Sequence, residues 1–248
     1  MNKHNNKWAV VLCGGIGSRM GSLTEHIPKP LLLVHNKPII GYIVSNLVNS
    51  GFNNIVLPLG YKGKQIKDYL IKAFDEKTIN FYFEETGDYS SIAKRIGLVK
   101  DIIPDDEDFF LLNSDTIFSF DIESMFNLHK KNNSFVTLSS VEVTSPWGIM
   151  TIKNDELISF DRERKVYALY NKLESKGMVH SGLAWIKKSS LDFIDLFSDI
   201  DFETELFKKS ISLNRASHYP IKGIWIPIDT PKDLDKINLK INIQELLK

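Results

Sequence analysis

Short apolar runs alternate with amphipathic stretches over about the first 120 residues, and this alternation is what most constrains the fold. Four runs have the β-branched and aromatic composition of strands and are bounded by Gly, Asn or Asp: residues 8–13, 53–60, 79–85 and 108–115. Between them, apolar residues recur three and four apart, as in helices that pack on a sheet: residues 38–51, 63–74 and 91–103. Such alternation predicts a mostly parallel sheet that is covered by helices on both faces.

The pattern changes after about Asp121. Strand-like runs then follow one another without long helices between them: residues 135–143, 147–154, 157–161 and 178–188. Helical patterns return at residues 201–211 and from Thr230 onward. We therefore predict an α/β fold, in which a Rossmann-like, mostly parallel mixed sheet is flanked by helices and continues into a mixed-sheet extension, as one domain over residues 1–248.

The charge balance of the sequence excludes partners that are bound through an overall positive charge. Its 31 basic residues equal its 31 acidic residues, so no overall positive field favours nucleic acid or an anionic membrane. The apolar stretch near the N-terminus is too short for a signal peptide or a membrane span. The lone Cys13 is expected to be buried and suits a reducing compartment. These features predict a cytoplasmic protein and leave open whether it forms a homo-oligomer.

A glycine-rich loop directly follows the first predicted strand. Residues 12–33 read LCGGIGSRMGSLTEHIPKPLLL, with Gly14, Gly15 and Gly17 near the start. Parallel strands place their carboxyl ends at ligand sites, and glycines let successive backbone N–H groups approach phosphate oxygens. The spacing matches neither GxGxxG nor a Walker loop, and a glycine-rich turn after a strand also occurs for purely geometric reasons.

Two cations strengthen the prediction of a phosphate loop. Arg19 follows the glycines, and Lys29 lies between two prolines, whose fixed φ presents its ammonium group from a stiff support. Backbone amides, a guanidinium and an ammonium on one loop match a triphosphate. We therefore predict that the loop binds a nucleoside triphosphate through five residues: Leu12, Gly14, Gly15, Gly17 and Ser18.

The stretch GGIGSRM followed by IPKPLL resembles the signature of the sugar-nucleotidyltransferases, and the resemblance extends over nearly the whole chain. These enzymes transfer a nucleoside monophosphate from an NTP to a phosphorylated acceptor and release pyrophosphate. The resemblance implies a GT-A-like nucleotidyltransferase fold, with a nucleotide-binding half over about residues 1–120 and an acceptor-binding half over about 121–248. It also implies catalytic roles for Arg19, at the leaving pyrophosphate, and for Lys29, at the α-phosphate.

Two aspartates follow predicted strands, Asp115 in FLLNSDT and Asp229 in IWIPIDTP. An aspartate at a strand end is often only a turn former or a helix cap, and Thr230 competes with Asp229 to cap the last helix. The resemblance implies instead that the two carboxylates hold Mg²⁺, which prefers oxygen ligands and keeps coordination positions for substrate phosphates. The predicted cofactor is therefore Mg²⁺.

The segment that reads TGDYSSIAKR resembles the T-G-D-x-S-x-x-x-x-R segment of glucose-1-phosphate cytidylyltransferases. This resemblance implies that the nucleotide is CTP and that the matching residues contact it: Thr86, Gly87, Ser90 and Arg95. Two glycines that precede the arginine in family members are replaced by Ala93 and Lys94. The alternative is that Lys94 and Arg95 form a solvated helix face.

The acceptor side departs from the resemblance. Sugar-transferring members carry an E-K-P motif that contacts the sugar and its phosphate, and the corresponding ISFDRERKVYALYNKLESKGM lacks it. Gly148 and Gly182 still match acceptor-side glycines, and Lys172 is a candidate for a relocated phosphate contact. The basic cluster in RERK either pairs with an α-carboxylate or forms an exposed hairpin: Arg162, Arg164 and Lys165.

We therefore predict a cytidylyltransferase that moves CMP from CTP to a small phosphorylated acceptor other than an ordinary sugar 1-phosphate. This combination resembles cytidylyltransferases of capsule phosphoramidate synthesis, a part of capsule polysaccharide biosynthesis, whose acceptor is the amide phosphate of L-glutamine. One alternative is a sugar-1-phosphate nucleotidyltransferase that uses CTP or another NTP. The other is a non-catalytic regulatory relative, but such relatives often lose the arginine, the lysine or the metal aspartates, which this chain retains.

Overall fold

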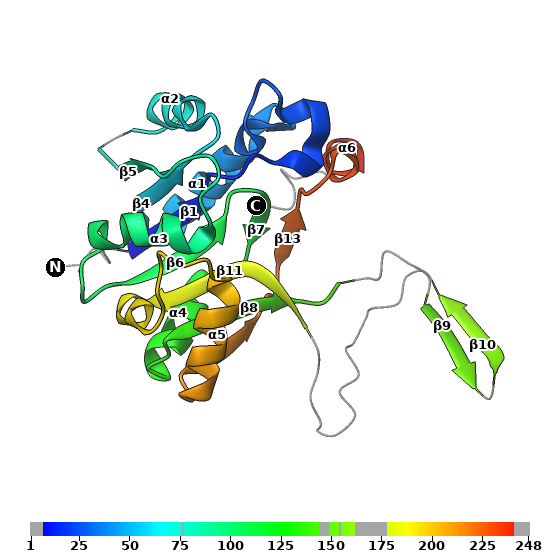
Figure 1. Ribbon diagram of the computed structural model, residues 1–248. Helices are drawn as coiled ribbons and strands as arrows, with labels where there is room; N and C mark the ends of the chain where they lie inside the picture. Colours follow the sequence, from blue (N-terminus) through cyan, green and yellow to red (C-terminus); the bar gives the residue numbers. More distant parts are fainter. Residues whose placement is uncertain (1–6, 76, 144–148, 154, 162–177, 241–248) are drawn as a thin grey trace.

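Seven strands form one sheet at the centre of the molecule (Figure 1). The computed structural model describes residues 7–75, 77–143, 149–153, 155–161 and 178–240. The strands lie side by side in the order β12 (Ala216–Pro220), β8 (Val136–Val141), β11 (Val179–Lys187), β6 (Asp108–Asn113), β1 (Lys7–Leu12), β4 (Phe52–Leu59) and β5 (Asn80–Glu85).

The direction of the strands matches the predicted fold class. The four strands predicted in the first half, β1, β4, β5 and β6, are parallel neighbours. Strand β11 is antiparallel to both β6 and β8, and β12 is parallel to β8. The predicted mostly parallel mixed sheet with a mixed extension is therefore confirmed, and the strands that extend it follow residue 121 in the chain.

Helices cover both faces of this sheet. On one face lie α1 (Ile39–Asn49), α2 (Gly63–Ala73) and α4 (Ile122–Lys131), and α6 (Pro231–Lys240) adds Ile237 to the same buried cluster. On the other face lie α3 (Ile92–Val99) and α5 (Phe202–Ser212). Along β1, alternate side chains enter the two clusters, as the two-residue period of a strand requires: Ala9 and Val11 the first, Trp8 and Val10 the second.

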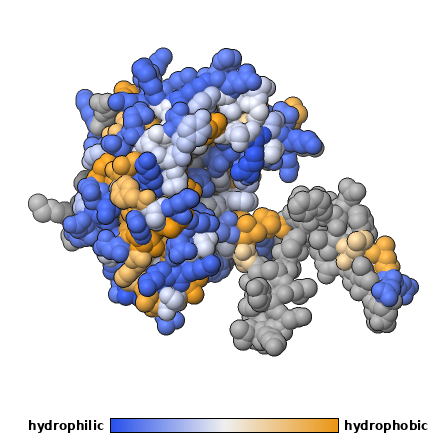
Figure 2. All heavy atoms as spheres, in the orientation of Figure 1, coloured by the Kyte–Doolittle hydropathy of each residue, from blue (hydrophilic) through white to orange (hydrophobic). Residues whose placement is uncertain are grey.

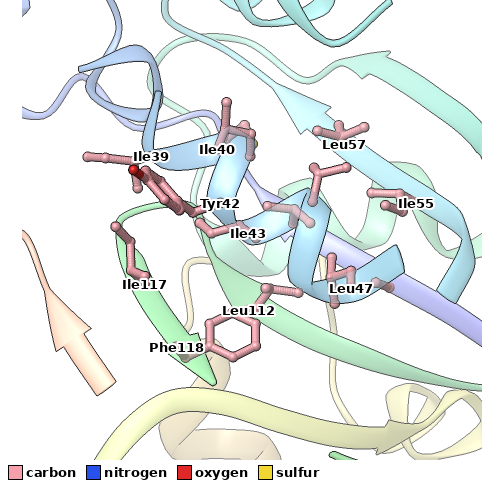
Figure 3. Close-up of a cluster of buried hydrophobic side chains, with 14 of the residues drawn as sticks. Ile39, Ile40, Tyr42, Ile43, Leu47, Ile55, Leu57, Leu112, Ile117 and Phe118 are labelled. Carbon is pink, nitrogen blue, oxygen red and sulfur yellow. The ribbon is translucent and has the colours of Figure 1, made fainter. Parts of the chain in front are cut away.

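Helix α1 is apolar on most sides because it lies between the sheet and the short strand β7 (Thr116–Ser119). Figure 3 shows side chains of α1 packed with those of β4 and β7: Ile39, Ile40, Tyr42, Ile43 and Leu47 with Ile55, Leu57, Ile117 and Phe118. The Tyr42 hydroxyl donates a hydrogen bond to the Val34 carbonyl at 3.0 Å, so its polar atom is satisfied inside this cluster. The packing holds β7 next to the carboxyl edge of the sheet.

The elements that the sequence pattern does not predict include α4, β7 and β12. Helix α4 buries only three side chains, Ile122, Met125 and His129, so its apolar stripe is weak. Its start was marked by Asp121, whose carboxylate accepts the Ser124 N–H at 2.8 Å. Strand β12 lies at the sheet edge and has no apolar run, because its residues are exposed or half-buried.

The two strands predicted between residues 147 and 161 are confirmed as an antiparallel pair, β9 (Ile149–Lys153) and β10 (Glu156–Asp161). In Figure 2, apolar side chains gather over α3 and the short helix η4 (Lys188–Phe193). Hydrophilic side chains dominate the surface around α2 and α6 in the same view. Within the described residues, no helix has the length and apolar character needed to cross a bilayer.

Candidate functional site

A cavity of about 460 Å³ opens at the carboxyl edge of the parallel strands. Leu12 at the end of β1 lies beside Asn113 at the end of β6, and both line the cavity. The rest of the wall comes from the glycine loop, the lysine between prolines, both predicted metal ligands, residues 88–90, Ile92 and Arg95. Most of the predicted site residues therefore line one cavity: Leu12, Gly14, Gly15, Gly17, Ser18, Arg19, Lys29, Ser90, Arg95, Asp115 and Asp229.

The glycine loop leads directly from β1 into a 3-10 helix, η1 (Ser18–Thr24). Gly17 precedes this helix with φ of +71°, a conformation that favours glycine. A Cβ atom at Gly17 would also lie 3.1 Å from Lys29 Cβ, so the loop and the lysine segment are in close contact. Gly14 is buried and Gly15 is exposed to the cavity, where an added Cβ would meet no atom within 4 Å.

Lys29 begins a single turn of 3-10 helix, η2 (Lys29–Leu31). Pro28 precedes the turn with φ of −69°, and its carbonyl accepts the Leu31 N–H at 2.8 Å. The turn is buried, and only 8% of Lys29 is exposed. The ammonium group nevertheless reaches the cavity, where it donates to Asp115 Oδ2 at 2.7 Å and to Asp229 Oδ1 at 3.2 Å.

Strand pairing brings Asp115 and Asp229 together from distant parts of the sequence. Asp115 directly precedes β7, and Asp229 follows β13 (Ile224–Pro227). These strands are antiparallel with Pro227 opposite Thr116, and the Ile228 N–H donates to the Asp115 carbonyl at 3.0 Å. The pairing therefore places both carboxylates on the same lysine.

Asp229 does not cap the last helix. The Asp233 carboxylate accepts the backbone N–H groups of Thr230 and Asp229 at 2.8 and 3.1 Å and the Thr230 hydroxyl at 2.8 Å. The Asp233 N–H in turn faces the Thr230 hydroxyl at 3.4 Å, which completes a reciprocal cap at the start of α6. Because Thr230 and Asp233 satisfy the helix start, the Asp229 carboxylate is left to face the cavity.

The site balances two negative charges with two positive charges. Arg19 Nη2 lies 3.2 Å from Asp229 Oδ1, and Lys29 contacts both carboxylates. The two carboxylates therefore converge on a point that a cation can occupy, which fits Mg²⁺. No group of three or more His, Cys, Asp or Glu side chains with metal-site geometry exists among the described residues, so further oxygen ligands would come from substrate or water.

The segment predicted to contact the nucleotide base is a tightly held loop after β5. Thr86 is 4% exposed, and its hydroxyl donates to the Leu59 carbonyl at 2.6 Å. Gly87 has φ of +86°, which suits glycine, and the Ser90 hydroxyl donates to the Thr86 carbonyl. Ser90 lines the cavity, whereas Thr86 and Gly87 lie behind its wall.

Arg95 on α3 lines the cavity but is only 4% exposed. The alternative of a solvated helix face is wrong for Arg95, whereas the neighbouring Lys94 is exposed. The Arg95 guanidinium donates to backbone carbonyls of two loops and of the end of β4, among them Gly14 at 3.0 Å and Ser90 at 3.1 Å. Burial lowers the pKa of the guanidinium, and the nearby Asp88 opposes this effect.

Of the predicted acceptor residues, Gly182 lies in the part of the chain that the structure describes. Gly182 is in β11 with φ of +77°, and an added Cβ would lie 2.9 Å from Asn113 Nδ2. It therefore supports Asn113, which lines the cavity, from behind. Gly148, Lys172 and the basic cluster at residues 162–165 lie outside the described residues.

Several cavity residues were not predicted: Tyr89, Ile92, Asn113 and Ser114. Asn113 and Ser114 directly precede Asp115, so their place at the strand end was an available signal. The Ser114 hydroxyl donates to the Leu12 carbonyl at 2.7 Å and joins the ends of β6 and β1. Cys13 is buried as expected, and burial raises the pKa of its thiol to about 12, so it is protonated at neutral pH.

Comparisons with known proteins agree with this geometry. A family model described as Nucleotidyl transferase matches residues 8–242. The chain is 28% identical to a probable glucose-1-phosphate cytidylyltransferase of Bacillus subtilis, over 93% of this chain and 94% of that protein. It is 30% identical to a mannose-1-phosphate guanyltransferase of Gibberella zeae, over 90% of this chain but only 61% of the fungal protein. A solved structure of a UTP-bound UGPase from Acinetobacter baumannii has the same fold, with a TM-score of 0.76 at 15% identity over 98% of this chain and 96% of that one.

Proposed function

The chain belongs to the nucleotidyl transferase family, and from this membership we propose that it is a cytidylyltransferase that moves CMP from CTP to a small phosphorylated acceptor. The reaction would join an acceptor phosphate oxygen to the α-phosphorus of CTP and break the bond to pyrophosphate. Both reactants are anionic, so the protein has to neutralise and align them. An acceptor phosphate is already ionised at neutral pH, so the chain needs no general base.

The observation that carries the proposal is the contact of Lys29 with both Asp115 and Asp229 beside the glycine loop. Lys29 is held by a buried turn and would meet the α-phosphate, where charge rearranges. Arg19 is exposed, contacts the same Asp229 oxygen as Lys29, and would hold the departing pyrophosphate. The amides of Gly14, Gly15 and Gly17 would receive the remaining phosphate oxygens.

Mg²⁺ held by Asp115 and Asp229 would neutralise phosphate charge and orient the acceptor toward the α-phosphate. Support for this cofactor comes from the donor set, because two converging carboxylates without nitrogen or sulfur ligands suit a hard cation. In the ligand-free chain the Lys29 ammonium takes the position of such a cation. Phosphate oxygens that draw Lys29 and Arg19 away would leave both carboxylates to the metal.

Two observations support CTP as the nucleotide. The residues that match the cytidylyltransferase segment form the wall of the same cavity or lie directly behind it. The relative from Bacillus subtilis, which aligns over nearly its whole length, is described as a probable glucose-1-phosphate cytidylyltransferase. The guanyltransferase from Gibberella zeae has similar identity, so the base has to be tested directly.

For the acceptor, we favour a phosphorylated metabolite other than an ordinary sugar 1-phosphate, with the amide phosphate of L-glutamine as the leading candidate. The support is the absence of the E-K-P motif and the basic cluster of Arg162, Arg164 and Lys165, which suits a carboxylate-bearing acceptor. The second candidate is a sugar 1-phosphate, which the names of the relatives favour.

Pyrophosphate release would test both choices. The purified chain is given Mg²⁺ and one of CTP, UTP, GTP or dTTP. Each nucleotide is paired with glucose 1-phosphate, mannose 1-phosphate, phosphoserine or the amide phosphate of L-glutamine. We expect release with CTP and the glutamine phosphate and little release with the sugars.

A chain with Asp235→Asn serves as a matched control, because Asp235 is exposed on α6 near the site and has no described partner. It should react like the parent. Release with CTP and a sugar 1-phosphate would support the cytidylyltransferase activity and contradict the proposed non-sugar acceptor. Release with another nucleotide would reject CTP, and no release with any pair would reject the proposed activity.

A further inference from the structure

We infer that Arg95 is a positioning residue for the nucleotide site: its buried guanidinium fixes the glycine loop and the Thr86–Ser90 loop relative to each other instead of binding the nucleotide itself. This inference rests on the proposed function, because it assigns the role that Arg95 has in nucleotide binding. It also revises the role that the family resemblance implies for this arginine.

The hydrogen bonds of Arg95 account for all its donors. Nε donates to the Ser90 carbonyl at 3.1 Å, and Nη2 donates to the carbonyls of Gly14 and Asp88 at 3.0 and 3.2 Å. Nη1 donates to the Thr86 hydroxyl at 2.6 Å and to the Leu59 carbonyl at 3.4 Å. A guanidinium has five N–H groups, so none remains for a base, a ribose or a phosphate.

These contacts join segments that are far apart in the sequence. The Gly14 carbonyl belongs to the phosphate loop, the Leu59 carbonyl ends β4, and the other three acceptors belong to the Thr86–Ser90 loop. Among the described residues Arg95 forms no ion pair within 4 Å, so its charge is solvated by peptide and hydroxyl dipoles. Acceptors in two loops and at a strand end can share one guanidinium only when these segments hold a single arrangement.

Two glycines make room for the guanidinium. A Cβ atom at Gly14 would lie 1.7 Å from Arg95 Nη1, and one at Gly60 would lie 2.8 Å from the same atom. Both positions therefore need a residue without a side chain for the loops to close around Arg95. Room for the guanidinium therefore depends on one glycine in the glycine loop and on one glycine directly after β4.

The Thr86–Ser90 loop shows what this arrangement does for the cavity. Its backbone is held at Thr86, Asp88 and Ser90, yet Tyr89 is 89% exposed and lines the cavity without a hydrogen bond to any described residue. A fixed backbone therefore presents an exposed aromatic side chain at the cavity. Loss of Arg95 would release this part of the wall without removing any group that touches the nucleotide.

The test compares Arg95→Lys, Thr86→Val and the double variant. Lysine keeps the charge but has three donors on a flexible stem, and valine removes the hydroxyl that accepts from Nη1 behind the cavity wall. CTP dissociation constants are measured by calorimetry, KM and kcat by pyrophosphate release, and amide hydrogen exchange on the ligand-free chain. If another NTP proves to be the substrate, it replaces CTP.

We expect Arg95→Lys to raise the nucleotide dissociation constant and KM about tenfold while kcat changes less than about threefold, because uniform binding is lost. Thr86→Val should also raise the nucleotide dissociation constant. The double variant should bind the nucleotide at most about twofold more weakly than Arg95→Lys does. Amide exchange should accelerate at residues 86–90 and 14–17 but not in α1 or β6. The control Lys94→Ala removes a neighbouring exposed charge and should match the parent.

The results that would contradict the inference differ from the result that would contradict the proposed function. If Arg95→Lys weakens binding while exchange in both loops stays as in the parent, and the effects of the two substitutions add, then Arg95 binds the nucleotide directly and the inference is wrong. Faster exchange throughout the molecule would also overturn it, because the role would then be general stability. If the parent binds no nucleotide, the proposed function fails, whereas the exchange measurement still decides whether Arg95 holds the loops.

Discussion

Lys29, Arg19 and the two aspartates pair with one another before substrate arrives. Lys29 is buried but spans both carboxylates, and Arg19 is 70% exposed beside Asp229. A mostly buried ammonium keeps its charge only when paired, so the aspartates stabilise Lys29 in the ligand-free chain. Each aspartate therefore has two roles in our proposal, to orient Lys29 and to hold the metal.

Asp115→Asn and Asp229→Asn should each lower kcat/KM by about a hundredfold, which corresponds to ~3 kcal/mol of transition-state stabilisation. The amide keeps the shape of the side chain, so far-UV circular dichroism should match that of the parent. Pyrophosphate release at saturating Mg²⁺ measures the loss. Parent-like turnover in either variant would contradict the assignment of that aspartate.

Gly14 and Gly15 are adjacent but should respond differently to alanine. At Gly14 the methyl group would overlap Arg95, so we expect Gly14→Ala to lower the free energy of unfolding by about 1–3 kcal/mol. At Gly15 the methyl group meets only open space in the cavity wall, so Gly15→Ala should fold normally and raise the nucleotide KM about tenfold.

Urea unfolding and nucleotide kinetics on both glycine variants separate the two effects. A Gly15→Ala variant with unchanged KM would show that the nucleotide does not approach this part of the loop. A Gly14→Ala variant with parent stability would show that Arg95 can move aside.

Short elements, more than long helices, place the functional groups. The single turn η2 presents Lys29, and the pairing of β7 with β13 aligns the two aspartates. The start of α6 is equally local, because Thr230 and Asp233 cap the helix and leave Asp229 available. Each of these elements depends on a few hydrogen bonds, so one substitution should disturb one element.

Asp233→Ala should lower the free energy of unfolding by about 1 kcal/mol, the usual effect of losing a helix cap. It should also reduce activity, since the Asp229 N–H loses its acceptor. Thermal melting and pyrophosphate release provide the two measurements, with Asp235→Ala as the control on the same helix. Stability equal to that of the control would mean that the cap does not stabilise α6.

The sheet of the whole molecule is continuous across the two predicted halves. Strand β11 from the second half pairs with β6 from the first, with Leu183 opposite Leu112 and Trp185 opposite Phe110. Helices from both halves contribute to each of the two buried clusters. The boundary near residue 121 between the two predicted halves therefore does not interrupt the sheet or its core.

We accordingly propose that the chain unfolds as one cooperative domain. Tryptophan fluorescence, which samples Trp8 in β1 and Trp185 in β11, and far-UV circular dichroism should give the same midpoint in urea. A single transition is expected because β6 and β11 cannot separate without exposing both clusters. Two transitions with different midpoints would instead indicate two domains.

The sequence by itself determined the elements and the chemistry that are local. Apolar periodicity located the parallel strands and their helices, since burial on both faces leaves a pattern in consecutive residues. Glycines after a strand and a lysine between prolines predicted a phosphate-binding loop, because their backbone preferences act within a few residues. The apolar periodicity did not predict helix α4, because only three of its side chains are buried.

Only the tertiary structure decided which groups meet. The pairing of β7 with β13 brings Asp115 and Asp229 to Lys29, and this contact depends on strands more than a hundred residues apart. The sequence also did not show where the Arg95 guanidinium points. Helical periodicity cannot distinguish an arginine that binds nucleotide from one that donates to two backbone loops. Hydrogen bonds between distant backbone segments form only when the fold is complete, so no local pattern in the sequence records them.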